Sequence, residues 1–556
     1  MSVFIGYPSF MAYQMMKGKK GNNDGFPSVP GMIARYSALG LTNEQMKENP
    51  VWVDKTGNGH DLQMKNFSWK EGSGISDVYP GALVFDGVDD YGVCENLPIL
   101  TKEKGYTVVA LRQWIEEKND STALVSNCKS WGQDGAFLFE YNNLRINFLN
   151  VAISFGFVSP VDRGKSPFSY QTSKLYNGKN IKPGSLIGSN ELVVGKGNKD
   201  FSTFSNVAIW ELVFLDHDAT EEELTKIKDY FVKTYPWLFP DQAWTVTGKT
   251  NEDEDRATIA NITGNGNDLV LSNFGFAEGS GYGLYAENYN GGRWVKSTNR
   301  ADLTWTSYSV NITSVKVAST QLYYQSYPEQ PSFTVPSYKI KVYGLKDGQT
   351  LSYKQVTYEG QQIYKISEDG IYTLPSFPFK ANGDWYGFTL DKIQESCDIT
   401  IEQIPEYEGY LVTDGVDDKV ESSPFTLNKD WTIVGNWTML SNIPSNCGII
   451  KVSSTFLYNS LDGVTIYFAG GSIKIQSKSI NAFCSDGRIY LNDWTEILKP
   501  DAQIASGGSK SSLNIASYSA NFTKMAFKNL AIYDGKNLSK DDCIKAYNYL
   551  QTLKAK

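Results

Sequence analysis

Histidine is almost absent from this sequence of 556 residues, in which His60 and His217 are the two examples. Zinc sites and Ser-His-Asp triads depend on histidine, and neither residue has an obvious partner along the chain, so the sequence supports no such centre. Cysteine is also sparse, and no C-x-x-C pair occurs. This spacing fits neither a disulfide framework nor a zinc site. We therefore expect the cysteines to be small, buried apolar residues; they are Cys94, Cys128, Cys397, Cys447, Cys484 and Cys543.

Long apolar runs are also missing. No stretch of 18 or more apolar residues occurs, so we expect no membrane-spanning helix. Met1–Tyr7 lacks a basic segment followed by an apolar core, and we do not expect a secretory signal peptide. The chain should be made in a cytoplasm and leave it, if at all, by another route. No G-x-x-x-x-G-K-[ST] loop supports nucleotide hydrolysis. A net charge of −9 indicates no basic surface for nucleic acid.

Aromatic residues, by contrast, are abundant at 13% of the chain, and they recur with Val, Ile and Thr in short runs. Such residues favour strands over helices. The length alone suggests roughly three or four domains, or fewer large β domains. The composition therefore predicts an all-β protein.

One motif occurs twice. Thr56–Leu62 reads T-G-N-G-H-D-L, and Thr263–Leu269 reads T-G-N-G-N-D-L, at an offset of 207 (263 − 56). A second match, N-F-x-x-x-E-G-S-G, starts at Asn66 and Asn273 with the same offset (273 − 66), which indicates duplication. The T-G-N-G segment predicts a tight turn, because Gly and Asn accept positive φ at little cost. His60 is Asn267 in the other copy, so a histidine site common to both copies is excluded.

Further matches extend both copies to their ends. Gly81–Tyr91 contains a strand followed by D-G-V-D-D, and Gly409–Asp418 repeats it at an offset of 328 (409 − 81). The offset has grown by 121 residues (328 − 207), so the second copy carries an insert. Each copy should close with one amphipathic helix, after Thr220 in the first and after Ser539 in the second. Strand patterns in the insert predict a separate small β-sandwich whose chain ends lie close together.

These matches divide the chain into four parts. About 200 residues of short strands and one helix predict a two-sheet sandwich for each copy, and the short connection between the copies suggests that they pack together. The predicted parts are an N-terminal arm and possible assembly anchor (1–31), sandwich 1 (32–237), sandwich 2 (241–285 and 407–556) and the inserted sandwich (286–406).

The repeat resembles a known family. Trp52–Leu62 (W-x-D-x-T-G-N-G-x-D-L), Phe85–Tyr91 (F-D-G-V-D-D-Y) and the terminal helix resemble the laminin-G-like, concanavalin A-like lectin and glucanase superfamily. The resemblance covers the two copies and implies two tandem jelly-roll sandwiches of antiparallel sheets. The second copy departs from the pattern, with Asn261 at the family's tryptophan-aspartate strand and Thr413 in place of Phe85. This fold hosts lectins, hydrolases and structural modules, so it implies no single activity.

No catalytic constellation follows from the residues. Glucanases of this fold carry carboxylates as E-x-D-x-E on one strand, and this motif is absent. The acidic run Glu252–Asp255 is expected to be a solvated loop. The D-G-V-D-D turns have two possible roles. Their aspartates could bind calcium, since some laminin-G-like domains bind it at a sandwich edge. The favoured interpretation is that the aspartates only form the turn, through Asx hydrogen bonds. The aspartates concerned are Asp86, Asp89, Asp90, Asp414, Asp417 and Asp418.

Sugar binding would require exposed aromatic rings, and Trp69, Trp131 and Trp294 beside glycines are the candidates, although most aromatics of a sandwich lie in its core. We therefore assign no catalytic, cofactor-binding or metal-binding residue and no cofactor, and we expect no enzyme.

Tandem laminin-G-like domains without an export signal resemble structural proteins of tailed bacteriophages, including crAss-like phages. The resemblance implies a virion protein, such as a head or tail fibre, that assembles in the host cytoplasm and turns lectin-like domains outward toward host or environmental glycans. Its expected partners are other virion proteins, bound through the arm, glycans and further copies of itself, with a trimer among the options, but neither nucleic acid nor membrane. The alternatives are a bacterial cell-surface or secreted glycan-binding protein, and a glycoside hydrolase or lyase with an unrecognised site.

Overall fold

The fold is taken from a computed structural model of the chain. It describes residues 24–100, 103–116, 122–128, 135–140, 166–180, 189–197, 202–277, 279–283, 295–296, 301–305, 309–317, 320–325, 333–335, 337–357, 360–375, 377–379, 384–393, 396–404, 407–440, 448–452, 455–460, 463–468, 471–475, 477, 479–498, 510–518 and 521–555.

Sandwich 1 consists of two antiparallel sheets packed face to face. In the first sheet the strand order is β12 (Lys179–Asn180), β11 (Leu175–Tyr176), β10 (Phe168–Thr172), β7 (Thr107–Glu116), β14 (Asn206–Leu215), β5 (Leu83–Asp86) and β4 (Gly74–Ile75), with β1 (Met32–Ser37) also paired to β14. In the second the order is β2 (Val51–Trp52), β3 (Leu62–Lys65), β6 (Tyr91–Cys94), β13 (Leu192–Val194), β8 (Val125–Cys128) and β9 (Gly135–Phe139).

Sandwich 2 repeats this topology, with two additional strands at one edge of its second sheet. Its first sheet has the order β41 (Glu496–Leu498), β40 (Arg488–Leu491), β39 (Ile480–Cys484), β34 (Trp431–Met439), β46 (Met525–Asp534), β31 (Leu411–Val412) and β18 (Gly281–Tyr282), with β15 (Gln242–Thr245) paired to β46. Its second sheet has the order β16 (Thr258–Ile259), β17 (Leu269–Ser272), β32 (Lys419–Ser422), β43 (Asn514–Ile515), β35 (Gly448–Val452), β36 (Thr455–Ser460), β37 (Gly463–Phe468) and β38 (Gly471–Ile475).

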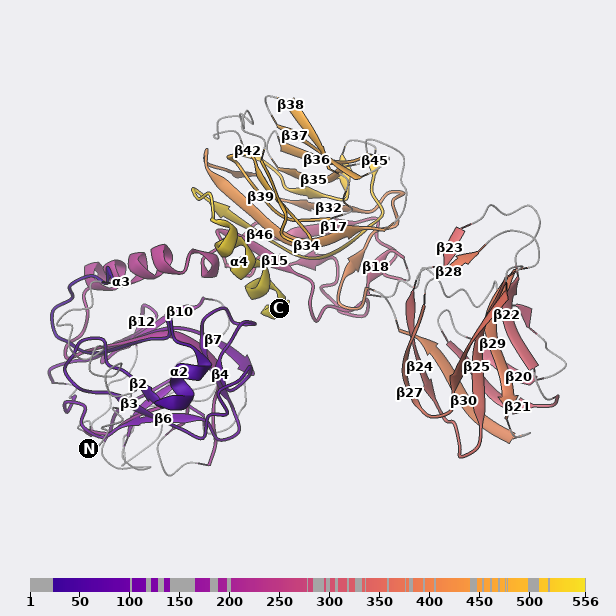
Figure 1. The fold of residues 1–556 in the computed structure, drawn as a ribbon. Helices are drawn as coiled ribbons and strands as arrows, with labels where there is room; N and C mark the ends of the chain where they lie inside the picture. The colour runs from indigo at the N-terminus through magenta and orange to yellow at the C-terminus, as the bar shows by residue number, and fades with distance from the viewer. Residues whose placement is uncertain are drawn as a thin grey trace, which may run out of the picture.

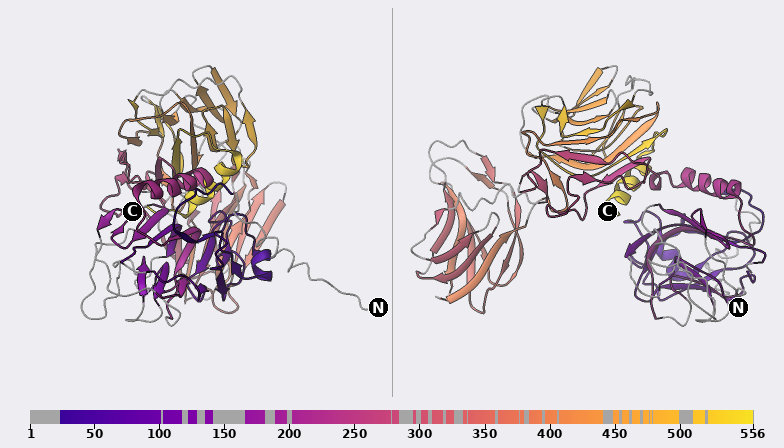
Figure 2. Two further views of the ribbon diagram at one scale, coloured as in Figure 1. Left: turned by 90° about the vertical axis from the view of Figure 1, so that its left-hand side faces the viewer. Right: turned by 180° about the vertical axis from the view of Figure 1, so that it is seen from behind.

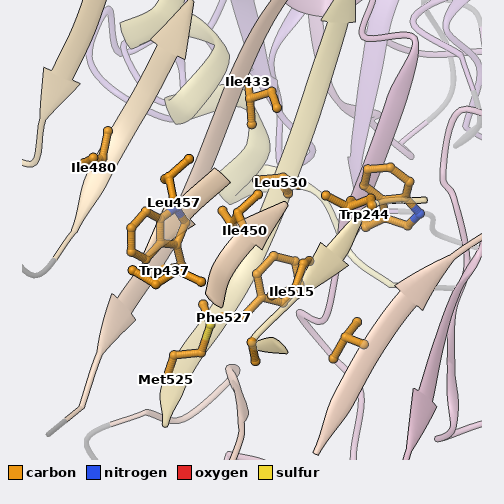
Figure 3. Packing of buried hydrophobic residues seen from close by; sticks show 14 of the residues in the cluster. Trp244, Ile433, Trp437, Ile450, Leu457, Ile480, Ile515, Met525, Phe527 and Leu530 are labelled. Carbon is orange, nitrogen blue, oxygen red and sulfur yellow. The ribbon is translucent and has the colours of Figure 1, made fainter. Parts of the chain in front are cut away.

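Alternation along the strands builds each core, as the pleat of a strand requires. In β3, Leu62 and Met64 are buried while the residues between and after them are exposed. Figure 3 shows the core of sandwich 2, where Trp437 of one sheet packs with Ile450 and Leu457 of the other. The prediction of an all-β fold built from packed sheets is confirmed.

The closing helices lie between the two sandwiches (Figure 1). Helix α3 (Glu221–Thr234) begins with a capping box, and α4 (Lys540–Thr552) begins with the Ser539 hydroxyl accepting a hydrogen bond from a backbone N–H of its first turn. A single apolar cluster joins both helices, the 3-10 helix η1 (Pro236–Leu238) and the outer faces of β14 and β46. Both strands are therefore buried on two faces. The sandwiches pack together, as the short connection between them suggested.

The insert leaves sandwich 2 at the β18–β31 hairpin and returns there, where the Gly283 N–H donates to the Tyr410 carbonyl at 2.7 Å. Figure 2 shows its sheets as a separate body with one apolar core. One sheet has the order β19 (Val295–Lys296), β22 (Thr320–Gln325), β29 (Trp385–Lys392), β25 (Thr350–Thr357) and β26 (Gly360–Ile366), and the other β20 (Ala301–Trp305), β21 (Ser309–Val315), β30 (Ser396–Gln403), β24 (Tyr338–Tyr343) and β27 (Gly370–Leu374).

Several short elements were not predicted. Helix α2 (Asn43–Glu48) begins with a capping box, in which Thr42 is the N-cap residue. Three two-stranded sheets pair β23 (Phe333–Val335) with β28 (Phe377–Phe379), β33 (Phe425–Thr426) with β42 (Lys510–Ser511), and β44 (Ser517–Tyr518) with β45 (Asn521–Phe522).

Part of the expected arm packs on sandwich 1. The Asp24 carboxylate lies 2.7 Å from the Arg35 guanidinium, which also stacks over the Phe26 ring at 3.9 Å. Val29 is buried in the cluster between the sandwiches. Residues 1–23 of the expected arm lie outside the described residues.

The repeated T-G-N-G motif forms a turn held by one side chain in each copy. In the first, the Asp54 carboxylate accepts hydrogen bonds from the backbone of Arg35, Thr56 and His60. In the second copy, the side-chain oxygen of Asn261 accepts a hydrogen bond from the Ala243 backbone N–H at 3.1 Å. Asn261, which departs from the family pattern, therefore retains the structural role of the aspartate.

A candidate ligand-binding groove on sandwich 1

A groove of about 320 Å³ lies on the outer face of sandwich 1, where β10 and the β11–β12 hairpin run beside α3. Ligand pockets in proteins typically measure roughly 300–1,000 Å³, so the groove has room for a small ligand. It is lined by Ser166, Phe168, Tyr170, Asn177, Glu221, Leu224, Thr225 and Lys228.

Two half-buried aromatic rings line one wall of the groove. Phe168 and Tyr170 stand two residues apart on β10, so the pleat places both rings on the outer face of the sheet. Their centroids are 6.1 Å apart with an angle of 50° between the planes. Phe168 is backed by Phe231 of α3, also at 6.1 Å. Burial raises the pKa of Tyr170, so the phenol is neutral near pH 7.

Polar side chains border these rings. Glu221, Thr225 and Lys228 are exposed on one face of α3, because residues four and seven positions apart lie on the same side of a helix. The Lys228 ammonium lies 5.9 Å from the Phe168 ring centroid. Asn177 enters from the β11–β12 turn with a φ of 44°, and its side-chain oxygen accepts a hydrogen bond from the Tyr170 backbone at 2.8 Å.

Sandwich 2 fills the corresponding place with its own side chain. Trp494, in the turn between β40 and β41, packs against Tyr547 of α4 at 5.6 Å and Tyr490 at 6.3 Å. The helix registers, set by Thr220 and Ser539, place Tyr547 where Lys228 stands in sandwich 1. The groove is thus a feature in which the two copies have diverged, rather than a consequence of the shared fold.

The sequence predictions did not include this groove. A usable signal was present in F-S-Y at Phe168–Tyr170, whose alternation predicts two aromatic rings on one face. The rings gain polar neighbours only because α3, more than 50 residues later, crosses over β10. That crossing depends on tertiary packing and leaves no local pattern.

The D-G-V-D-D turns bring their aspartates together. In each turn, one oxygen from each of the three carboxylates lies within 4.8 Å of the others, so the geometry could hold a divalent cation. The turn also explains these residues without an ion. Asp86 accepts hydrogen bonds from the backbone N–H of Val88 at 2.7 Å and Asp89 at 3.2 Å, while Asp90 accepts one from Asp86 at 3.0 Å.

The second turn has the same hydrogen bonds, with Asp414 accepting from Val416 and Asp418 accepting from Asp414, each at 2.7 Å. The Ser280 hydroxyl adds a hydrogen bond to Asp418 at 2.9 Å, which gives a physical reason for the repeated E-G-S-G motif. Burial raises the pKa of Asp90 to about 7 and that of Asp418 to about 6, and the neighbouring carboxylates act in the same direction.

The other residues singled out from the sequence have structural roles wherever the structure describes them. Trp69 stacks on Phe67 at 4.8 Å and covers the core of sandwich 1, so its ring is only partly exposed. Trp131 and Trp294 lie outside the described residues. The acidic run from Glu252 to Asp255 forms exposed turns, in which Asp255 pairs with Lys249 at 2.6 Å. The cysteines with described side chains, Cys94, Cys397, Cys484 and Cys543, are buried and free of disulfides.

One expectation about histidine was wrong. His217 does have partners, since its ring nitrogens lie 3.3 Å from carboxylate oxygens of Asp216 and Glu223. Glu223 is also the third residue of α3, and its side chain completes the capping box by accepting a hydrogen bond from the Thr220 backbone. Within the described residues, no helix has the length and apolar character needed to span a membrane.

Comparisons with known proteins show little similarity. No family model matches the sequence, and no curated protein matches it. Among solved structures, the chain is similar to Trypanosoma rangeli sialidase in complex with sialic acid, at 13% identity and a TM-score of 0.26, over 41% of this chain and 38% of the sialidase. It is also similar to the receptor-binding domain of botulinum neurotoxin type G, at 13% identity and a TM-score of 0.22, over 67% of this chain and 98% of that domain. The chain thus spans about two fifths of the sialidase.

Proposed function

We propose that this chain is a non-catalytic adhesion protein that binds a saccharide in the groove on sandwich 1. The observation that carries the proposal is the combination of two aromatic rings, Phe168 and Tyr170, with a border of amide, carboxylate, hydroxyl and ammonium groups. The C–H face of a sugar ring can pack on an aromatic face, while its hydroxyls need hydrogen-bond donors and acceptors at the edge. The groove offers both in one small volume.

The chemistry of the groove favours binding over hydrolysis. Glycoside hydrolysis ordinarily requires a pair of carboxylates flanking the scissile bond. The described lining contains a single carboxylate, that of Glu221. A glycosidase or lyase therefore has less support, and turnover of a polysaccharide that stops when Glu221 is changed to Gln would replace this proposal.

A shallow groove on one sandwich suggests weak binding by each chain. Linking several weak sites can raise the overall affinity by about 10²–10⁴ without any new contact. This suits the virion setting that the sequence resemblance implies, in which several copies of a fibre or surface protein face a host surface together. The virion location, the host glycan and the homo-oligomer all belong to the proposal.

The anchoring role of the arm is tested by truncation. Because Asp24, Phe26 and Val29 pack on sandwich 1, the truncation should remove residues 1–23 and leave residues 24–31 in place. We expect a folded protein that no longer joins the particle. Incorporation at the wild-type level would contradict the anchoring role.

The saccharide site is tested by a glycan array followed by calorimetric titration of the best ligand. Tyr170→Ala removes one ring and Lys228→Tyr introduces the residue of sandwich 2, and each should weaken binding about tenfold or more. Tyr343→Ala is the matched control, since Tyr343 is an exposed tyrosine of the insert. Equal affinity of all four proteins would refute the site.

A further inference from the structure

A buried charged cluster lies between the sheets of sandwich 1, beneath the groove. At its centre, the Glu140 carboxylate accepts hydrogen bonds from five donors of the described residues, all on strands of the facing sheet. The donors are Arg112 Nε at 2.8 Å and Nη2 at 2.5 Å, Trp114 Nε1 at 2.7 Å, Ser169 Oγ at 2.6 Å and Tyr176 OH at 3.0 Å.

The cluster is fully enclosed and charged. Glu140 is 0% exposed and Arg112 is 1% exposed. Burial opposes ionisation of Glu140, but Arg112 and the other donors outweigh it and hold the pKa of this carboxyl below its usual value.

Both ends of the groove are fastened to this cluster. Arg112 donates from Nη1 to the Ser166 carbonyl at 2.7 Å and from its backbone to the Pro167 carbonyl at 2.8 Å. On the other side, the Asn177 amide donates to the Ser169 hydroxyl at 3.3 Å, and that hydroxyl donates to Glu140. The Ser166 backbone is therefore held by the Arg112 guanidinium, and the Asn177 turn is linked to Glu140 through the Ser169 hydroxyl.

In the second copy, apolar residues replace two described members of this cluster. The strand registers place Trp437 where Arg112 stands and Ile489 where Tyr176 stands, and both replacements are buried in an apolar core. Buried ion pairs are seldom more stabilising than well-packed apolar groups. Glu140 also has a φ of 52°, a conformation that costs a residue with a side chain some backbone energy. General stability of the sandwich therefore does not explain the cluster.

We infer that Glu140 and Arg112 are positioning residues of the groove, which fix Ser166, Phe168 and Asn177 relative to α3. The inference depends on the proposed saccharide function only for the identity of the ligand. The structural part, that the ion pair orders residues 166–180, stands without any ligand.

The test uses the full-length chain with Arg112→Met/Glu140→Gln, which removes both charges together and leaves no unpaired buried ion. Hydrogen exchange is followed by mass spectrometry in residues 166–180 and in β14, and the Kd of the best array saccharide is measured. We expect exchange of residues 166–180 to rise about tenfold or more while β14 is unchanged, and the Kd to rise about tenfold.

The matched control is Arg35→Met/Glu211→Gln, which removes another buried ion pair of sandwich 1. It should leave exchange in residues 166–180 as in the wild type. The inference is overturned if the Arg112/Glu140 variant exchanges like the wild type there, or if it loses protection in β14 as well, since the pair would then support the whole sandwich. A wild-type chain that binds no saccharide refutes the proposed function, and the exchange measurement still decides the positioning role.

Discussion

Substitution of Asp90 tests whether the D-G-V-D-D turn is stable without a metal ion. The Asp90 pKa of about 7 in the folded chain lies roughly three units above that of an ordinary aspartate, so the fold favours the neutral acid. The contribution of this group to stability is therefore full below about pH 4 and is lost as the pH rises through about 7. Asp90→Asn imitates the neutral acid at every pH.

The pKa shift of Asp90 sets the size of the expected change in stability. Each pKa unit corresponds to about 1.4 kcal/mol, which gives a ceiling of about 4 kcal/mol above pH 7. The Asp90 side chain is itself buried, while the carboxylates of Asp86 and Asp89 beside it are partly exposed and screened by solvent, so we expect less than this ceiling, about 1–2 kcal/mol. For a domain of this size, that is a rise in Tm of about 3–6 °C at pH 8 and little change near pH 4.

Differential scanning calorimetry of the full chain at several pH values measures this effect. Asp418→Asn is the matched variant in sandwich 2, and its smaller pKa shift, to about 6, predicts a smaller rise. The reasoning is refuted if Asp90→Asn lowers the Tm at pH 8, or if the wild type and the variant have the same dependence on pH.

Other predictions follow from the same turns. Adding 1 mM calcium at pH 7 should shift the wild-type Tm by less than about 1 °C; a larger shift that Asp90→Asn abolishes would establish a calcium site. Asn261→Asp should destabilise sandwich 2 by about 1–2 kcal/mol in urea unfolding, because the Asn261 amide donates to the Gly266 carbonyl at 2.5 Å and a carboxylate cannot. Unchanged stability would contradict the role assigned to that amide. Trp494→Ala should cost about 2 kcal/mol in the same assay by removing the ring that fills the second groove, and a neutral result would contradict its packing role.

The sequence predicted the features that arise from local patterns. Alternation and duplication indicated the all-β fold, and the capping residues Thr220 and Ser539 marked the start of both closing helices. Features made by distant segments were missed. The groove needs α3 to cross over β10, and the Glu140 cluster needs β9 to deliver a carboxylate to the opposite sheet. Residue spacing in the sequence predicts neither of these contacts, because both depend on how the sheets and the helix pack.

We propose that sandwich 1 holds a saccharide between β10 and α3, and a crystal structure of the chain with its best array ligand would show whether it does. We predict a sugar ring over Phe168 and Tyr170, with hydroxyls within hydrogen-bonding distance of Asn177 or Lys228. A saccharide bound beside Trp69, at an aspartate turn or on the insert, with the groove left empty, would contradict it.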